Sequence, residues 1–192
     1  DARLVWVRTS WPTLMEDFVS GAFDIGMSGI SIIPSRAREG FFTTAYHEGG
    51  KTPITHCNLK SRFASLDAID RAGVRVIVNP GGTNERYVNT ALKAATIVRH
   101  PDNETIFEAL RAGKADLMIT DAIEVLVMAK RYDDLCPSMP SSLLTQQNKG
   151  WLLPKDPALL TRAEQFLGPL IESGELDRLK ASAIERAAQT AH

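Results

Sequence analysis

The sequence predicts a two-lobed α/β protein with mainly parallel sheets, two hinge strands and a ligand cleft between the lobes. Short apolar strands alternate with amphipathic helices along most of the 192 residues, with a turn signal after each. Short connections between such units are typical of βαβ structure. The segment 54–145 contains enough units for one lobe. The flanks 1–53 and 146–192 cannot each form a core, so we expect them to join as a second, discontinuous lobe.

The first flank is predicted to begin with a strand at residues 4–7. A helix follows, with Ser10 as its cap and Gly21 beyond its end. The remaining elements of this flank are predicted to be a strand, a short helix and an extended segment at residues 23–27, 35–39 and 51–57. Because the chain starts directly on an apolar strand, we expect it to begin in the middle of a domain.

The middle segment shows the clearest alternation of strands and helices. Its predicted strands are residues 74–78, 96–98 and 115–120. Its predicted helices are one at 65–69 capped by Ser65, one starting at Thr83, one capped by Asn103 and one at 121–131. The second flank is predicted to hold a strand at 150–153 and helices at 157–172 and 175–188. The crossings near 51–55 and 149–153 are the expected hinge strands.

Composition excludes several classes of function. The chain has 22 Lys and Arg against 23 Asp and Glu, a formal net charge of −1. A protein that binds nucleic acid mainly by electrostatics needs a basic excess or a basic stripe, so we expect no such partner. No apolar run approaches the ~20 residues that span a bilayer, so we expect no membrane partner.

The two cysteines, Cys57 and Cys136, form no CxxC pair, and no histidine lies at metal-ligand spacing to either. We therefore expect no metal site, and no cofactor. The cysteines are either a long-loop disulfide of an exported protein or two buried thiols, and the sequence leaves both open.

Ligands of parallel sheets bind beyond the carboxyl ends of strands, against helix N-termini. The run 79–84 follows a strand, and its two glycines allow close approach of a ligand to the backbone. Thr83 and Asn84 add side-chain donors, which suit a carboxylate or a phosphate. The alternative is an ordinary turn before a helix.

Two further strand ends carry polar groups. Ser28 and Gly29 end one strand, and Arg36 beyond them could bind a carboxylate in a bidentate pair or lie on the surface. Asp121 and Glu124 begin a helix one turn apart, where they are ligand-binding groups or a plain capping box.

An aromatic and a cation complete the set of candidates. Trp11 follows a strand end and could flank a ring-shaped ligand, or belong to the core. Lys51 lies on the first hinge strand and faces the cleft if its neighbours pack away from it. Most of the candidate groups are donors or cations, which indicates a small ligand that carries carboxylates.

These residues, in this order, resemble the type II periplasmic amino-acid-binding proteins. The resemblance is closer to one enzymatic branch, the cyclohexadienyl dehydratases. Four stretches look like that branch, and together they are specific: residues 9–12, 50–55, 79–85 and 120–124. The resemblance covers essentially the whole chain. Because proteins of this family begin with a strand and a helix that this sequence does not show, the resemblance implies that this opening unit of the first lobe is absent.

The resemblance implies conversion of prephenate to phenylpyruvate, and of arogenate to phenylalanine, by loss of water and CO₂. It makes Glu124 the general acid and Asn84 a group that orients the reacting atoms, with Trp11 beside the ring. It assigns the side-chain carboxylate to Arg36, Ser28, Gly29 and Thr83, and the ligand amino group to Asp121. Lys51 is the candidate for the ring carboxylate.

The assignment of Glu124 sets a physical condition. A general acid must be protonated near neutral pH, so its pKa must rise above ~4.3. Burial and the Asp121 charge raise it, whereas Arg36 and Lys51 lower it.

The resemblance also implies a periplasmic protein without a membrane segment. Because relatives can be oligomeric, it further implies a homo-oligomer. The alternative function is a non-catalytic amino-acid-binding protein of an ABC transporter. Such a protein needs Asp121 for an ammonium group but has no use for an acid at Glu124.

Overall fold

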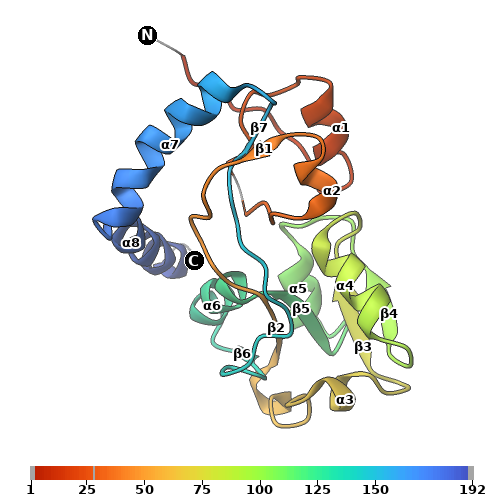
Figure 1. Ribbon diagram of the computed structural model, residues 1–192. Helices are drawn as coiled ribbons and strands as arrows, with labels where there is room; N and C mark the ends of the chain where they lie inside the picture. Colours follow the sequence, from red (N-terminus) through yellow and green to blue (C-terminus); the bar gives the residue numbers. More distant parts are fainter. Residues whose placement is uncertain (1–2, 28, 190–192) are drawn as a thin grey trace.

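The computed structural model describes residues 3–27 and 29–189. Its strands form a five-stranded sheet and a separate two-stranded sheet, each covered by helices. In Figure 1 the small sheet lies with α1 and α2 at the top, and the large sheet lies below with the middle part of the chain. Two chain segments connect the sheets, as the predicted two-lobed fold requires.

The large sheet has the strand order β4-β3-β5-β2-β6. Its strands are β2 (Lys51–His56), β3 (Arg75–Val78), β4 (Thr96–Arg99), β5 (Leu117–Asp121) and β6 (Leu135–Pro137). β3 is parallel to β4 and to β5, whereas β2 is antiparallel to β5 and β6. The sheet is therefore mixed, and the expectation of mainly parallel sheets is wrong here. The crossover helices specify only the parallel pairs, because β2 enters from the other sheet.

Both faces of this sheet are covered by helices. Along β5, Met118 points to one side, and Leu117 and Ile119 point to the other, as the two-residue period of a strand requires. Met118 packs with residues of α5 (Ile106–Arg111) and α6 (Ala122–Arg131). Leu117 and Ile119 pack with residues of α3 (Leu66–Ile69) and α4 (Thr83–Ala91). These helices and strands match the predicted middle segment closely.

The small sheet pairs β1 (Phe41–Phe42) with β7 (Leu152–Leu153) in antiparallel fashion. A core of Leu14, Phe18, Ile30 and Leu152 holds α1 (Leu14–Val19) against it. The other helices of this part are α2 (Pro34–Ala37), α7 (Pro157–Glu172) and α8 (Glu175–Gln189). α8 packs against both α7 and α6, so it reaches from the small sheet to the large one.

The predicted strand at residues 4–7 is absent. This segment forms no strand, and Leu4, Val5 and Trp6 are 69%, 60% and 82% exposed. An extended segment becomes a strand only when a neighbour accepts its backbone hydrogen bonds, and among the described residues it has no such neighbour. The predicted strand at 23–27 is similarly reduced to a single bridge between Gly26 and Leu152.

Two predicted helix caps are also wrong. Ser10 lies one turn before α1, where its carbonyl oxygen accepts from the N–H groups of Thr13 and Leu14. The residue before α5 is Thr105 and not Asn103. By contrast, the hydroxyl of Ser65 does cap α3, since it accepts from Ala68 N.

The two connecting segments, 43–50 and 138–151, run side by side (Figure 1). The His47 carbonyl accepts from Lys149 N at 2.8 Å, and the Gly49 carbonyl accepts from Gln147 N at 2.6 Å. The predicted crossings are 51–55 and 149–153. The first lies in β2, and residues 152–153 of the second lie in β7, because pairing with the two sheets already begins there. Residues 149–151 do belong to a connecting segment.

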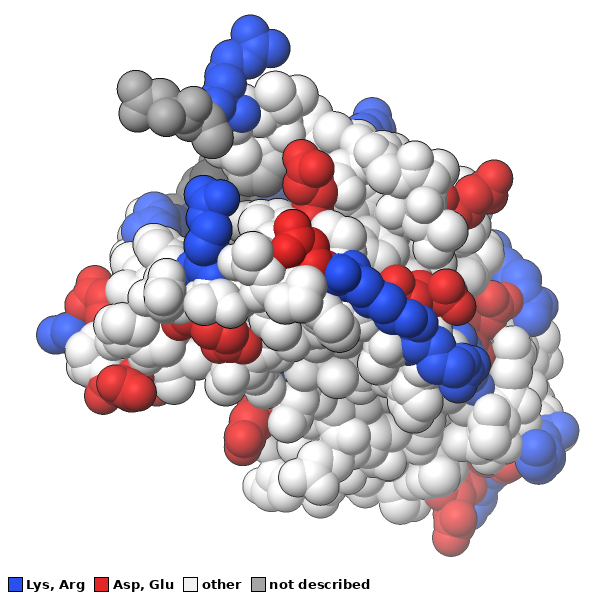
Figure 2. Space-filling view, turned by 45° about the horizontal axis from the view of Figure 1, so that its top comes forward, with Lys and Arg blue, Asp and Glu red and all other residues white. Residues whose placement is uncertain are grey.

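A disulfide joins Cys57 of the 3₁₀ turn η1 (Cys57–Leu59) to Cys136 of β6, which answers the question the sequence left open. Acidic and basic side chains are interspersed over the face drawn in Figure 2. Among the described helices, none has the length and the apolar character needed to cross a membrane.

Candidate functional site

A cavity of about 310 Å³ lies between the two sheets. The large sheet contributes the end of β5, the loop after β3 and the starts of α4 and α6. Trp11 and Gly29 line the cavity from the other sheet. The connecting segments contribute Tyr46, His47 and Lys149, and α8 contributes Lys180. The volume lies at the lower end of the ~300–1,000 Å³ typical of small-molecule sites.

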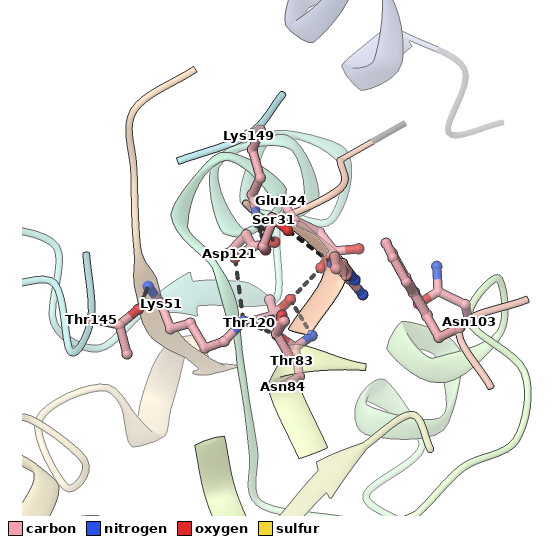
Figure 3. Close-up of polar contacts among 12 residues, drawn as sticks. Ser31, Lys51, Thr83, Asn84, Asn103, Thr120, Asp121, Glu124, Thr145 and Lys149 are labelled. Atoms are coloured by element: carbon pink, nitrogen blue, oxygen red, sulfur yellow. Dashed lines mark hydrogen bonds and ion pairs between the residues drawn. The ribbon is translucent and has the colours of Figure 1, made fainter. Parts of the chain in front are cut away.

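Asp121 occupies the centre of the polar network in Figure 3. One carboxylate oxygen lies 3.3 Å from Lys51 Nζ, and the other lies 2.6 Å from Lys149 Nζ. Its side chain makes no hydrogen bond to the start of α6, although it precedes that helix. The capping-box alternative therefore does not hold, and the carboxylate serves the cavity network.

Lys51 lies beneath the cavity rather than on its lining. The residue is fully buried, and its Nζ donates to Thr83 Oγ1 at 3.1 Å, to Asn84 Oδ1 and to Asp121. Burial lowers the pKa of Lys51, and the Asp121 charge opposes that change. The three protons of an ammonium group match the three oxygens. This amine thus fixes the side chains of Thr83 and Asn84 at the start of α4.

Glu124 lines the cavity and is joined to Asn84 through one hydroxyl group. Asn84 Nδ2 donates to Thr120 Oγ1 at 2.9 Å, and that hydroxyl donates to Glu124 Oε2 (Figure 3). Burial raises the pKa of Glu124; the Thr120 hydrogen bond opposes this change, and the Asp121 charge adds to it. The carboxyl group is thereby favoured in its neutral, proton-donating form.

Trp11 lies at the edge of the cavity, held by polar contacts at both ends. Its Nε1 donates to Asn103 Oδ1 at 3.3 Å, and the guanidinium of Arg36 lies 5.7 Å from its ring centroid. Arg36 is buried and donates to the Ser31 carbonyl at 3.1 Å. Burial lowers the pKa of Arg36. Arg36 is not among the described residues that line the cavity. It contacts the Trp11 ring, which does line it.

The loop at 79–84 brings the two sheets into contact. Gly81 has φ +81°, and a Cβ at this position would lie 2.6 Å from Pro12 Cα. The Gly81 N–H donates to Glu85 at 2.9 Å. Gly82 precedes α4 without a side-chain cap, and Thr83 and Asn84 face the cavity as the sequence predicts.

The structure thus brings six predicted site residues together on the lining: Trp11, Gly29, Thr83, Asn84, Asp121 and Glu124. Lys51 and Arg36 lie behind that layer. Ser28 lies outside the described residues. No group of three or more His, Cys, Asp or Glu side chains suited to a metal ion occurs in the described part of the chain.

Sequence reasoning did not assign to the site six of the lining residues: Tyr46, His47, Asn103, Ile123, Lys149 and Lys180. Lys149 lies at the start of the second predicted crossing, so the argument that selected Lys51 at the start of the first crossing would also have applied to it. Its Nζ donates to Ser31 Oγ at 2.7 Å as well as to Asp121. Lys180 donates to the Tyr46 carbonyl at 3.1 Å and pairs with Asp177. Burial, followed by the Lys180 and Lys149 charges, lowers the pKa of His47.

No family model matches the chain. Among curated proteins, it is 46% identical over 191 residues to a cyclohexadienyl dehydratase of Pseudomonas aeruginosa, covering 71% of that protein. It is 21% identical over 172 residues to the L-cystine-binding protein TcyJ of Escherichia coli, covering 64% of it.

Solved structures show the same fold. An ancestral amino acid-binding protein, described as a precursor of cyclohexadienyl dehydratase, matches with a TM-score of 0.80 at 27% identity, over 92% of this chain and 75% of that one. A substrate-binding protein of an amino acid ABC transporter from Streptococcus pneumoniae, bound to L-arginine, matches with a TM-score of 0.85 at 22% identity, over 95% and 76% of the two chains. The two-lobed fold predicted from the sequence is therefore confirmed.

Proposed function

Because the chain belongs to the cyclohexadienyl dehydratase family, we propose that it converts prephenate to phenylpyruvate, and arogenate to phenylalanine, with Glu124 as the general acid. The observation that supports this proposal most directly is the position and the burial of the Glu124 carboxyl group. This group lines the cavity, burial raises its pKa, and Thr120 holds one of its oxygens. A binding protein without a reaction needs no such acid.

In the proposed reaction, the bond between the ring and its carboxylate breaks and CO₂ leaves. The electron pair of that bond enters the ring, which becomes aromatic as the bond to the ring hydroxyl breaks. Hydroxide is a poor leaving group, so Glu124 transfers its proton to that oxygen, and water leaves. Glu124 then takes a proton from solvent before the next turnover.

The remaining lining residues are proposed to hold the substrate. Trp11 flanks the ring, and Thr83 and Gly29 bind the side-chain carboxylate, with Ser28 and Arg36 as further candidates. The two lysines that reach the lining, Lys149 and Lys180, favour a dicarboxylate by charge. Lys51 is assigned to holding Asn84 and Asp121 in place, because it does not line the cavity and its three hydrogen bonds are made from behind to the lining residues Thr83, Asn84 and Asp121.

We further propose that the lobes comprise residues 1–53 with 146–192, and 54–145. β2 enters the large sheet at Lys51, close to the first of these boundaries. A periplasmic location is supported by the Cys57–Cys136 disulfide, because such bonds persist in oxidising compartments.

The test is an assay of prephenate conversion with the purified protein and with Glu124→Gln. Glutamine keeps the size of the side chain and can still accept from Thr120, but it cannot donate a proton of comparable acidity. We expect turnover to fall by about 10²–10⁴-fold, the usual contribution of a general acid, while substrate binding measured by calorimetry changes little.

The alternative, a non-catalytic amino-acid-binding protein, predicts a different result. The protein would then bind an amino acid tightly and convert neither prephenate nor arogenate. That outcome would refute the proposed enzyme activity. Equal turnover by Glu124→Gln and the unmodified protein would leave the activity intact but refute the role of Glu124.

A further inference from the structure

The two proposed substrates differ in one group that the cavity has to accommodate. Prephenate carries a keto group beside its side-chain carboxylate, whereas arogenate carries an ammonium group there. An ammonium ion that loses water in a cavity needs an anion or several acceptors in exchange. The carboxylates of the lining therefore determine which substrate is favoured. This argument depends on the function proposed above.

Only Asp121 and Glu124 are acidic among the described residues that line the cavity. Glu124 is an unsuitable partner for an ammonium ion. Burial favours its neutral form, and the Thr120 hydroxyl already occupies one of its oxygens. If Glu124 is to act as the general acid, its proton must also remain available for the ring hydroxyl.

Asp121 is already paired on both of its oxygens. Lys51 lies 3.3 Å from Oδ1, and Lys149 lies 2.6 Å from Oδ2. The side chains of both lysines are almost wholly buried, at 0% and 4% exposure, so water screens these charges little. The cluster of this one carboxylate and the two ammonium groups has a net charge of +1. A third ammonium group approaching Asp121 is therefore repelled by the group as a whole.

The rest of the described lining offers no further carboxylate. Lys180 reaches the same cavity from α8, where Asp177 pairs with it. His47 also lines the cavity, but an imidazole gives no negative charge that could balance the ammonium group of the ligand. A keto oxygen, by contrast, can accept a hydrogen bond from an ammonium group at no charge penalty.

We propose that Lys149, by neutralising Asp121 together with Lys51, makes this site select the α-keto acid over the α-amino acid, that is, prephenate over arogenate. Lys149 is the specificity-determining member of the pair because it lines the cavity, whereas Lys51 lies behind it.

The experiment compares kcat/KM for prephenate and arogenate, and it compares binding of phenylpyruvate and phenylalanine by calorimetry. We expect the keto acid to be favoured in both comparisons by at least about tenfold, since a like charge in a poorly screened site costs at least that much. The binding comparison applies even if the protein converts neither substrate. Failure of the proposed function and failure of this inference are thus separate results.

The variants are Lys149→Gln and Lys149→Met. Glutamine keeps a donor for Asp121 and Ser31 while removing the charge, and methionine keeps the length without polar contacts. In both, the preference for the keto acid should fall by about tenfold or more. Circular dichroism checks folding, and Lys149→Gln serves if Lys149→Met does not fold.

The matched control is Lys180→Met, which removes a lining lysine that contacts Asp177 and Tyr46 rather than Asp121. It should weaken both keto and amino ligands by a similar factor and leave the preference unchanged. Equal affinities for the keto and amino acids in the unmodified protein would overturn the proposal. So would an unchanged preference in Lys149→Gln, or a loss of preference in Lys180→Met as large as that in Lys149→Gln.

Discussion

At Thr120, a single hydroxyl group connects two residues of the site. It accepts from Asn84 Nδ2 and donates to Glu124 Oε2, and Asn84 in turn accepts from Lys51. Every donor in this sequence of contacts meets an acceptor. In the proposed mechanism the other oxygen of Glu124 would carry the proton, so we propose Thr120 as a positioning residue for the general acid.

We predict that Thr120→Val lowers kcat by about tenfold, part of the contribution that a well-placed acid makes. It should also move the alkaline limb of the pH–rate profile to higher pH. The Thr120 hydrogen bond lowers the pKa of Glu124, so its removal raises that pKa. A proton donor is lost as pH rises through its pKa, and that loss then occurs at a higher pH.

The control is Thr120→Ser, which retains the hydroxyl group and should keep the alkaline limb in place. The measurement is kcat against pH for the three proteins. A limb that stays in place in Thr120→Val, or moves to lower pH, would contradict the positioning role. Loss of stability alone, expected at about 1–3 kcal/mol for two unsatisfied partners, would not move the limb.

For single residues, the sequence predicts the site residues that lie at or just after the ends of strands, and it misses most of those that lie elsewhere. Asn84, Asp121 and Glu124 follow strands whose carboxyl ends meet at one edge of the sheet. Lys149 lies at the start of the second predicted crossing and could have been selected by the argument used for Lys51. Lys180 comes from a late helix, whose position depends on how the sheets are joined, and no local pattern in the sequence indicates that it reaches the cavity. The depth of Lys51 was likewise not predictable, since it depends on packing from both sides of β2.

At the scale of elements, prediction succeeds where a strand has partners close by in the sequence. β3, β4 and β5 are joined by crossover helices, and their burial follows from the alternation of strands and helices. The segment 4–7 has an apolar pattern typical of a strand but no neighbour among the described residues. The hydrophobic pattern can specify a buried face, but it cannot supply the hydrogen bonds of an adjacent strand.

β6 is an edge strand of only three residues, and the disulfide fastens its Cys136 to the turn after β2. We predict that replacing both cysteines by alanine lowers the free energy of unfolding by about 4 kcal/mol, from the entropy of closing a loop of this length. Cys57 and Cys136 are 79 residues apart in the sequence. Chemical denaturation of the oxidised protein and the double variant measures the loss.

Reduction of the unmodified protein provides the control for this prediction. It should lower stability by about the same amount as the double variant, whereas a reductant should leave the variant unaffected. If the midpoint of unfolding is the same in the oxidised protein and in the double variant, the disulfide does not contribute the predicted constraint.

At the scale of the whole molecule, the site exists only because the two sheets meet across it. Trp11, on the side of the small sheet, donates to Asn103, on the side of the large sheet. Pro12 contacts the loop that contains Gly81. In two-lobed proteins, bringing such surfaces together excludes water from the ligand and strengthens the electrostatic interactions inside. Contact at Gly81 should therefore be needed for tight substrate binding.

We predict that Gly81→Ala raises KM by about tenfold or more, since a displacement of about 1 Å at a site is costly. Its Cβ would lie 2.6 Å from Pro12 Cα and 2.7 Å from Pro12 N, closer than real Cβ atoms approach backbone. The two sheets must therefore separate, or the loop at 79–84 must move. Steady-state kinetics measures the change, and small-angle scattering with bound substrate distinguishes separation from local movement.

The matched control for Gly81 is Gly73, which has nearly the same φ, +84° against +81°. A Cβ at Gly73 would meet nothing within 4 Å. Both alanine variants carry the left-handed strain of roughly 1–2 kcal/mol, but only Gly81→Ala obstructs the contact between the sheets. Gly73→Ala should lose stability and keep its KM. An equal rise of KM in both variants would attribute the effect to strain, and an unchanged KM in Gly81→Ala would show that the contact with Pro12 is not required for binding.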